Sequence, residues 1–129
     1  MAGPGDRRRR GQEAEALAAG WLEGLGFQVL ARNHATRRGE IDLICREGEV
    51  TCFVEVRSRT GEAQGSPLLT VTPAKARRVV AAAEDWLARG GAAPGGLRFD
   101  VVAVTLGDGP PRLELVRGAF DADGRPAIW

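Results

Sequence analysis

Two short apolar runs, each containing one carboxylate in its middle, constrain the fold of this chain more than any other feature. Residues 40–45 read Glu-Ile-Asp-Leu-Ile-Cys, residues 50–57 read Val-Thr-Cys-Phe-Val-Glu-Val-Arg, and Gly48 lies between them. Two runs of this length, rich in strand-forming residues and separated by a glycine-containing turn, predict a β-hairpin. The fold must therefore accommodate a hairpin that carries Asp42 and Glu55 within its apolar surface.

The alternation of side chains along a strand decides where these acids point. We take residues 47 and 48 as a two-residue turn. Asp42 then lies opposite Phe53 and on the same face as Glu55, its diagonal neighbour at roughly 7–8 Å. Carboxylates at that distance can bind one hard cation between them. The opposite face carries valine, leucine and isoleucine and is expected to pack into the core.

An alternative interpretation is an amphipathic hairpin whose acids face water, and a one-residue slip would place the acids on opposite faces. Burying a carboxylate without a partner is costly, so the apolar neighbours favour the metal site. Glu15 adds a third acid, because helical spacing places it beside Ala18 and Leu22 on the apolar stripe of the first predicted helix. Glu15 either faces the same cavity or reaches water at the boundary, whereas Glu13 points away.

Patterns in the rest of the chain predict one α/β domain with the order α-β-β-β-α-β-β, over residues 12–129. Thr72 followed by Pro73 marks a helix start, and Gly26 and Gly90 mark helix ends. The expected elements are helices at 12–25 and 72–89 and strands at 27–32, 40–45, 50–57, 98–106 and 112–117, with a polar connection at 33–39 and a loop at 60–71. Residues 1–11 are expected to form a disordered basic arm.

Composition excludes several classes of protein. No run approaches 18 apolar residues and no apolar signal sequence is present, so we expect no membrane span and a cytoplasmic location. Residues 1–10 carry four Arg and one Asp, a net +3, so the remaining residues sum to −2 of the total +1, and charge alone is weak evidence for nucleic-acid binding. Cys45 and Cys52 lack the spacing of a zinc site and are expected to be buried thiols, while the single His34 excludes mechanisms that need two histidines.

The motifs now in view resemble the YraN family, a bacterial family of uncharacterised proteins that is similar to archaeal Holliday junction resolvases within the restriction-endonuclease-like superfamily. The resemblance covers about residues 11–106. Weaker matches are Lys75 and residues 98–100. The resemblance rests mainly on Ala14-Glu15, Gly39-Glu40-Ile41-Asp42-Leu43-Ile44 and Phe53-Val54-Glu55-Val56-Arg57.

This resemblance implies a restriction-endonuclease-like fold, a central mixed β-sheet flanked by helices, and a site for Mg²⁺ or Mn²⁺. The ligands would be Asp42, Glu55 and the Val56 carbonyl, and Glu15 would help to bind the metal or orient water. The activity implied is phosphodiester hydrolysis in branched or damaged DNA. The resemblance to resolvases also suggests a homodimer, since a junction offers two symmetric strands. Phosphate contacts are expected from Arg37, Arg38, Arg57, Arg59 and the arginines of residues 7–10. Lys75 either faces the site as a further nucleic-acid contact or faces solvent. Arg98 and Asp100, which share a strand face, either match the family motif or form a structural pair.

Arg57 departs from the family pattern, which has Lys at this position. Arg supplies positive charge but does not release its proton, so it cannot act as a base. We therefore assign Arg57 the role of orienting phosphate, and two other functions stay open. One is a nucleic-acid-binding module of a repair or recombination complex that no longer cleaves, and the other is a small partner protein that makes no nucleic-acid contact.

Overall fold

The computed structural model describes residues 4–60 and 71–126, with the backbone alone at residues 4–8 and 10. The element order α-β-β-β-α-β-β is confirmed. The elements are α1 (Pro4–Gly24), β1 (Gln28–Ala35), β2 (Glu40–Glu47), β3 (Val50–Thr60), α2 (Pro73–Ala88), β4 (Leu97–Leu106) and β5 (Arg112–Phe120).

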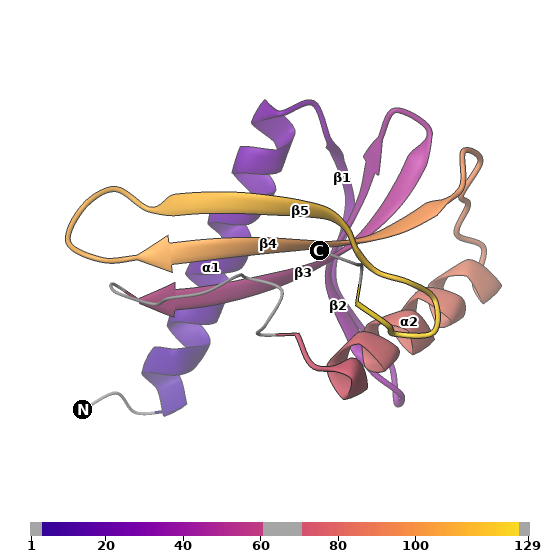
Figure 1. Ribbon diagram of the computed structural model, residues 1–129, viewed down its shortest axis with the longest axis horizontal. Coiled ribbons are helices and arrows are strands. Elements are labelled where there is room, and N and C mark those ends of the chain that lie inside the picture. The colour runs from indigo at the N-terminus through magenta and orange to yellow at the C-terminus, as the bar shows by residue number, and fades with distance from the viewer. Residues whose placement is uncertain (1–3, 61–70, 127–129) are drawn as a thin grey trace.

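The strands form one mixed five-stranded sheet in the order β1-β2-β3-β4-β5. β3 pairs with β4 in parallel, and every other neighbouring pair is antiparallel. A parallel pair needs a crossover connection, and α2 supplies it between β3 and β4. Figure 1 shows α1 and α2 on opposite sides of the sheet, as expected for the α/β class predicted from the sequence.

Both faces of the hairpin are buried, which corrects the expectation that only one face packs into the core. On the side of α1, Ala14, Ala18 and Leu22 pack against Leu43 and Val54. On the side of α2, Val79 and Ala83 pack with a second set of strand residues that includes Ile44, Phe53, Phe99 and Val101. A sheet with helices on both sides buries both faces, so its strands are apolar on both sides.

The hairpin register differs from the expected one by two residues. The observed pairs run from Glu47↔Val50 to Leu43↔Val54, so the turn consists of Gly48 and Glu49. Gly48 has a φ of 61°, and Glu49 is not among the described non-glycine residues with positive φ. A turn with positive φ only at its first central position is the type II′ pattern, which selects glycine there. The shift is an even number of residues, so Asp42 and Glu55 still share a face. They are the next residues along β2 and β3 beyond the pair Leu43 and Val54.

Helix α1 begins eight residues earlier than expected, at Pro4, so residues 4–11 are helical where a disordered arm was predicted. Proline is tolerated in the first turn of a helix, and the Arg residues that follow are good helix formers. β1 is also longer than expected and reaches Ala35, which shortens the connection to residues 36–39. Two leucines are exposed in this region, Leu17 within α1 and Leu25 just after it.

The start of α2 agrees with the sequence. The Thr72 hydroxyl accepts a hydrogen bond from the Lys75 N–H at 3.2 Å, and Pro73 occupies the first turn. The loop expected at 60–71 falls largely outside the described residues. Cys45 and Cys52 are buried free thiols, as predicted. Within the described part of the chain, no helix combines the length and apolar character needed to cross a membrane.

Candidate active site

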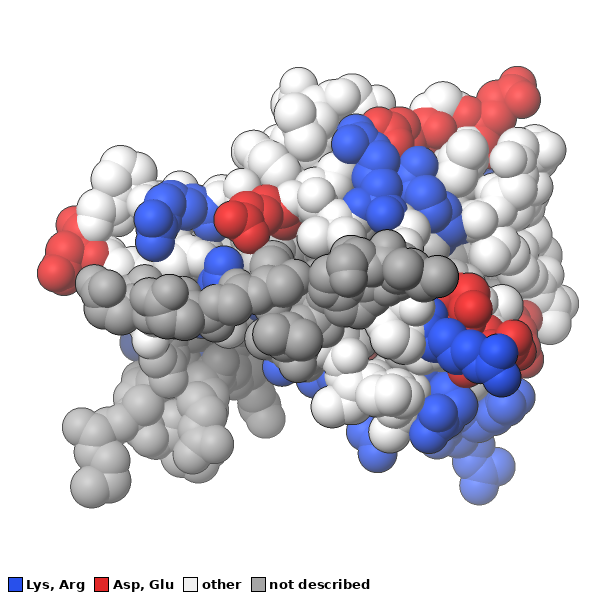
Figure 2. All heavy atoms as spheres, viewed as in Figure 1, with Lys and Arg blue, Asp and Glu red and all other residues white. Residues whose placement is uncertain are grey.

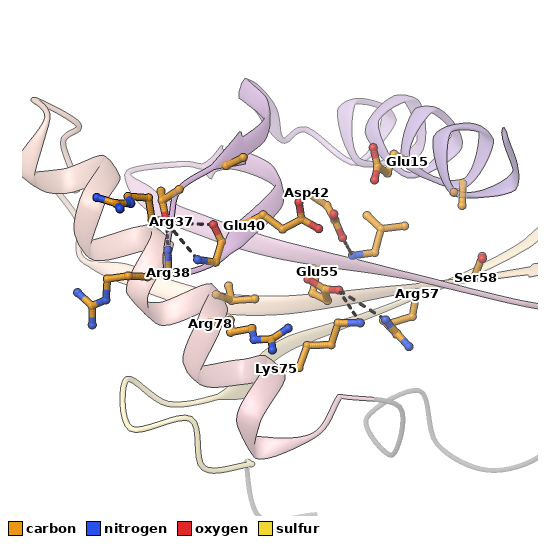
Figure 3. A pocket seen from close by; sticks show the side chains of 17 residues that line it. Glu15, Arg37, Arg38, Glu40, Asp42, Glu55, Arg57, Ser58, Lys75 and Arg78 are labelled. Carbon is orange, nitrogen blue, oxygen red and sulfur yellow. Dashed lines mark hydrogen bonds and ion pairs between the residues drawn. The ribbon is translucent and has the colours of Figure 1, made fainter. Parts of the chain in front are cut away.

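A cavity of about 520 Å³ lies where α1, the β1–β2 turn, the β2–β3 hairpin and the first turns of α2 meet (Figure 3). It is lined by the four residues that were predicted from the sequence to be catalytic: Glu15, Asp42, Glu55 and Arg57. The charged residues lining it are Glu15, Glu40, Asp42, Glu55, Arg37, Arg38, Arg57, Lys75 and Arg78. Charged groups from α1, the β1–β2 turn, the hairpin and α2 therefore line one open cavity.

Asp42 and Glu55 form the base of this cavity. Glu55 is 5% exposed, and Asp42 is half-buried on the neighbouring strand. The Val56 N–H donates a hydrogen bond of 2.8 Å to Asp42 Oδ2, which fixes the carboxylate beside β3. The N–H and C=O of one strand residue point to the same neighbouring strand. The carbonyl of Val56 is therefore directed toward the side on which Asp42 lies.

Glu15 reaches the same cavity from α1, above Asp42 in Figure 3. Its neighbour Ala14 and Ala18, one turn later, are buried, and these small side chains let the helix lie close to the sheet. Burial and, second, the charge of Asp42 raise the pKa of Glu15 to about 7. Of the two alternatives for Glu15, the geometry favours the one in which it faces the hairpin acids, and Glu13 is exposed as predicted.

Two cations approach the same oxygen of Glu55. Arg57 NH1 lies 3.7 Å from Glu55 Oε1, and Lys75 Nζ lies 3.9 Å from it. Both distances exceed that of a hydrogen bond. The Nε of Arg57 is buried and has no hydrogen-bond partner among the described residues. The guanidinium of Arg57 therefore keeps donor capacity for an anion.

The pKa values show that these cations do not neutralise the acids. Burial, followed by the charge of Asp42, raises the pKa of Glu55 to about 8 despite Lys75 and Arg57. Burial likewise raises the pKa of Asp42, against the opposing hydrogen bond from Val56. Raised pKa values mean that the charged forms are destabilised in this site. A bound cation would relieve that cost.

The turn between β1 and β2 places two arginines at the rim. Thr36 Oγ1 accepts hydrogen bonds from the N–H groups of Arg38 and Gly39, both at 3.1 Å, and donates one to the Gly39 carbonyl at 3.0 Å. Any Cβ at Gly39 would collide with the backbone carbonyl of Arg78, so glycine is required where this turn meets α2. Arg37 and Arg38 are exposed and line the cavity.

Figure 2 shows that Lys and Arg side chains gather at the lower right, in the region of α2, with Asp and Glu side chains next to them. Arg78 of α2 lines the cavity, and it was not predicted from the sequence. Lys75, Arg78 and Val79 all line the cavity because residues three and four apart share one helix face, a spacing that would have predicted Arg78.

Arg59, another predicted phosphate contact, lies outside the cavity lining. Its Nε donates to Thr105 Oγ1 at 3.0 Å, and its NH2 lies 3.6 Å from Glu114 Oε2. In the basic segment of residues 7–10, Arg9 is exposed, and the other three side chains fall outside the described residues. Phosphate contact by these arginines stays a prediction.

The donor set fits a hard divalent cation. No cluster of three or more His, Cys, Asp or Glu side chains suited to a metal occurs among the residues at 4–60 and 71–126. Mg²⁺, however, is commonly bound through one or two carboxylates, with water and substrate phosphate completing its shell. Asp42, Glu55 and the Val56 carbonyl supply three oxygen donors of that kind, and burial raises the pKa of both acids despite the nearby cations.

Comparisons with known proteins place the chain among relatives of similar length. The model of the uncharacterised protein family UPF0102 matches residues 14–104. A UPF0102 protein of Anaeromyxobacter sp. (strain Fw109-5) is 62% identical over 125 residues, covering 97% of this chain and 94% of the relative. The UPF0102 protein of Chromohalobacter salexigens is 49% identical, covering 91% and 94%, and that of Symbiobacterium thermophilum is 47% identical, covering 89% and 98%.

Proposed function

The chain belongs to the uncharacterised protein family UPF0102, and we propose that it is a divalent-metal-dependent nuclease that hydrolyses phosphodiester bonds. One observation carries the proposal: Glu15, Asp42 and Glu55 share one cavity, and each has a raised pKa. Groups whose pKa values are strongly shifted by burial and by neighbouring charges cluster at functional sites. The arginines and the lysine that line the same cavity match a polyanionic substrate.

Asp42, Glu55 and the Val56 carbonyl would hold Mg²⁺ or Mn²⁺. When bound, such a cation lowers the pKa of a coordinated water and stabilises charge on a phosphoryl oxygen. Glu15 is placed to accept a hydrogen bond from the attacking water and so orient it. Arg57 binds the non-bridging phosphate oxygens through its planar guanidinium. Arg37, Arg38 and Arg78 hold the flanking phosphates at the rim.

The substrate that we propose is branched or damaged DNA, as the resemblance to junction resolvases implies. Composition also bears on this choice, because aromatic residues are 5% of the chain and Tyr is absent. Proteins that bind single strands without sequence preference stack bases on aromatic side chains, so a structured duplex is favoured over an extended single strand. A junction has two equivalent scissile strands, which a homodimer would engage symmetrically.

The test is incubation of the protein with branched, duplex and single-stranded DNA in Mn²⁺, in Mg²⁺ and in EDTA. We expect cleavage of branched DNA with either metal and none in EDTA. The double variant Asp42→Asn, Glu55→Gln should stay folded, lose Mn²⁺ binding in isothermal titration and cleave at background level. Undiminished Mn²⁺ affinity in this variant would exclude the site.

A nucleic-acid-binding module that does not cleave is the second candidate. Arg57 favours it, since the family pattern has Lys there and Arg cannot exchange a proton. This candidate predicts binding to branched DNA that weakens with salt, together with no cleavage in Mn²⁺ or Mg²⁺ at any protein concentration. Cleavage that depends on metal and on Asp42 would reject it.

A further inference from the structure

Lys75 is the only lysine in the chain, against 17 arginines, and it lines the cavity that holds Glu15, Asp42 and Glu55. Its Nζ is 3.9 Å from Glu55 Oε1, on the side of α2 (Figure 3). The strand position expected to carry a lysine holds Arg57 instead. The ammonium that β3 lacks is therefore supplied from a different element.

The backbone of Lys75 is held firmly in place. Its N–H donates to the capping hydroxyl of Thr72, and Ala76 and Val79, one and four residues later, are 2% and 1% exposed in the core. The first turn of α2 therefore cannot move without disturbing the packing beneath it. The flexible side chain of Lys75 can therefore move with the reacting groups while its backbone stays in place.

Lys75 and Arg57 are not equivalent in the cavity, although both approach Glu55 Oε1. Arg57 extends from β3, the strand that also carries Glu55, whereas Lys75 reaches the same oxygen from α2. The ammonium of Lys75 is compact and carries three rotatable donors, whereas a guanidinium has a rigid planar fork suited to two phosphate oxygens.

We propose that Lys75 is a catalytic residue that donates hydrogen bonds to the attacking water and to the scissile phosphate, while Arg57 orients that phosphate. This inference rests on the proposed nuclease function and assigns to α2 the lysine role that the family motif places on β3. It also replaces the earlier expectation that Lys75 is a general phosphate contact. The two roles predict different changes. A phosphate contact affects the affinity for DNA, whereas a catalytic residue affects the rate at which bound DNA is cleaved.

The experiment compares Lys75→Met with Arg77→Met, which removes a cation from the same helix turn but outside the cavity lining. Single-turnover cleavage of branched DNA is measured in Mn²⁺ at saturating protein, and DNA affinity is measured in EDTA as a function of salt. We expect Lys75→Met to lower the saturated rate by about 10²-fold, the scale of losing one preorganised electrostatic contact. Arg77→Met should cleave at the parent rate.

Lys75→Arg is the conservative variant, and we expect it to restore DNA affinity but not the full rate, because the longer planar group does not fit against the water. If Lys75 only anchors the backbone, Lys75→Met lowers the salt slope by about 0.9 in EDTA and cleaves at the saturated rate of Arg77→Met. That result overturns the inference and leaves the nuclease proposal standing. A parent protein that cleaves nothing with either metal overturns the nuclease proposal and, with it, this inference.

Discussion

Two groups of carboxylates lie in and around the β2–β3 hairpin, and they differ in how well neighbouring cations and N–H groups compensate their charge. Near the turn, Glu47 accepts hydrogen bonds from Arg98 at 2.8 Å and from Arg117 at 2.7 Å, and its pKa is lowered to about 2. The fully buried Asp100 accepts two hydrogen bonds from Arg98 and one from the Gly118 N–H. We call this group the paired cluster.

Glu15, Asp42 and Glu55 form the second group, the cavity cluster. Its nearest cations are 3.7 and 3.9 Å away, and all three acids have raised pKa values. The paired cluster is complete within the chain and stabilises the fold. The cavity cluster costs stability in the isolated chain, and such a cost is tolerated where binding or catalysis requires it. The difference supports the proposal that the cavity cluster serves a ligand.

The largest expected effect is on folding free energy and should have opposite signs in the two clusters. Asp100→Ala leaves Arg98 without its main partner and the Gly118 N–H unpaired, so it should lower the free energy of unfolding by about 3 kcal/mol, as for a broken buried ion pair. Glu55→Gln at the same pH should cause no loss, or a gain, because it removes a destabilised charge. Urea denaturation at pH 8 in EDTA measures both. A large loss in Glu55→Gln would remove the distinction between the clusters.

The second prediction concerns Arg57, which belongs to the cavity cluster. Arg57→Ala should lower the cleavage rate by about 10²-fold while leaving Mn²⁺ affinity unchanged or higher, because a cation next to the metal ligands is removed. Arg57→Lys should retain or improve cleavage. Initial rates on branched DNA and isothermal titration with Mn²⁺ provide the two measurements. Cleavage by Arg57→Ala at the parent rate, or a complete loss in Arg57→Lys, would contradict the assigned role.

Much of the hairpin followed from the sequence, because the period of a strand is fixed. Asp42 and Glu55 share a face in any register shifted by an even number of residues, so the wrong turn position did not change the site. Which residues pair directly across the hairpin depends on whether the turn is formed by residues 47 and 48 or by residues 48 and 49. A type II′ turn prefers Gly48 at its first position and so selects the second placement. Composition and strand spacing alone do not distinguish the two placements.

Other parts of the site depend on how elements meet, which the sequence does not reveal. The sequence left open whether Lys75 faces the cavity or solvent, because the docking angle of α2 decides the direction of its side chain. The N-terminal extension of α1 was missed because nothing in residues 4–11 signals an apolar face, and helix propensity alone is a weak guide. The Arg98–Asp100 pair was anticipated as structural from their i, i+2 spacing on one strand, and the structure confirms it.

The last prediction, and the sharpest test of the comparison, concerns the pH dependence of stability in EDTA. Glu55 has a folded-state pKa raised to about 8, so its contribution to stability is fully present below its ordinary pKa of 4.5 and is lost as pH rises through 8. Glu47 has a lowered pKa of about 2, so its contribution is present above 4.5 and is lost as pH falls through 2. The free energy of unfolding should therefore decline on both sides of about pH 5. Glu55→Gln should flatten the alkaline decline without changing the acid one, and Glu47→Gln should do the reverse while lowering stability at neutral pH. Glu15, with a pKa of about 7, leaves a residual alkaline slope in Glu55→Gln.

Urea denaturation of the three proteins at intervals from pH 2 to pH 9 separates the two limbs, because groups common to all three cancel in the differences. An alkaline limb that is identical in the parent and in Glu55→Gln would mean that Glu55 is already compensated in solution, and the cavity cluster would then be no different from the paired one.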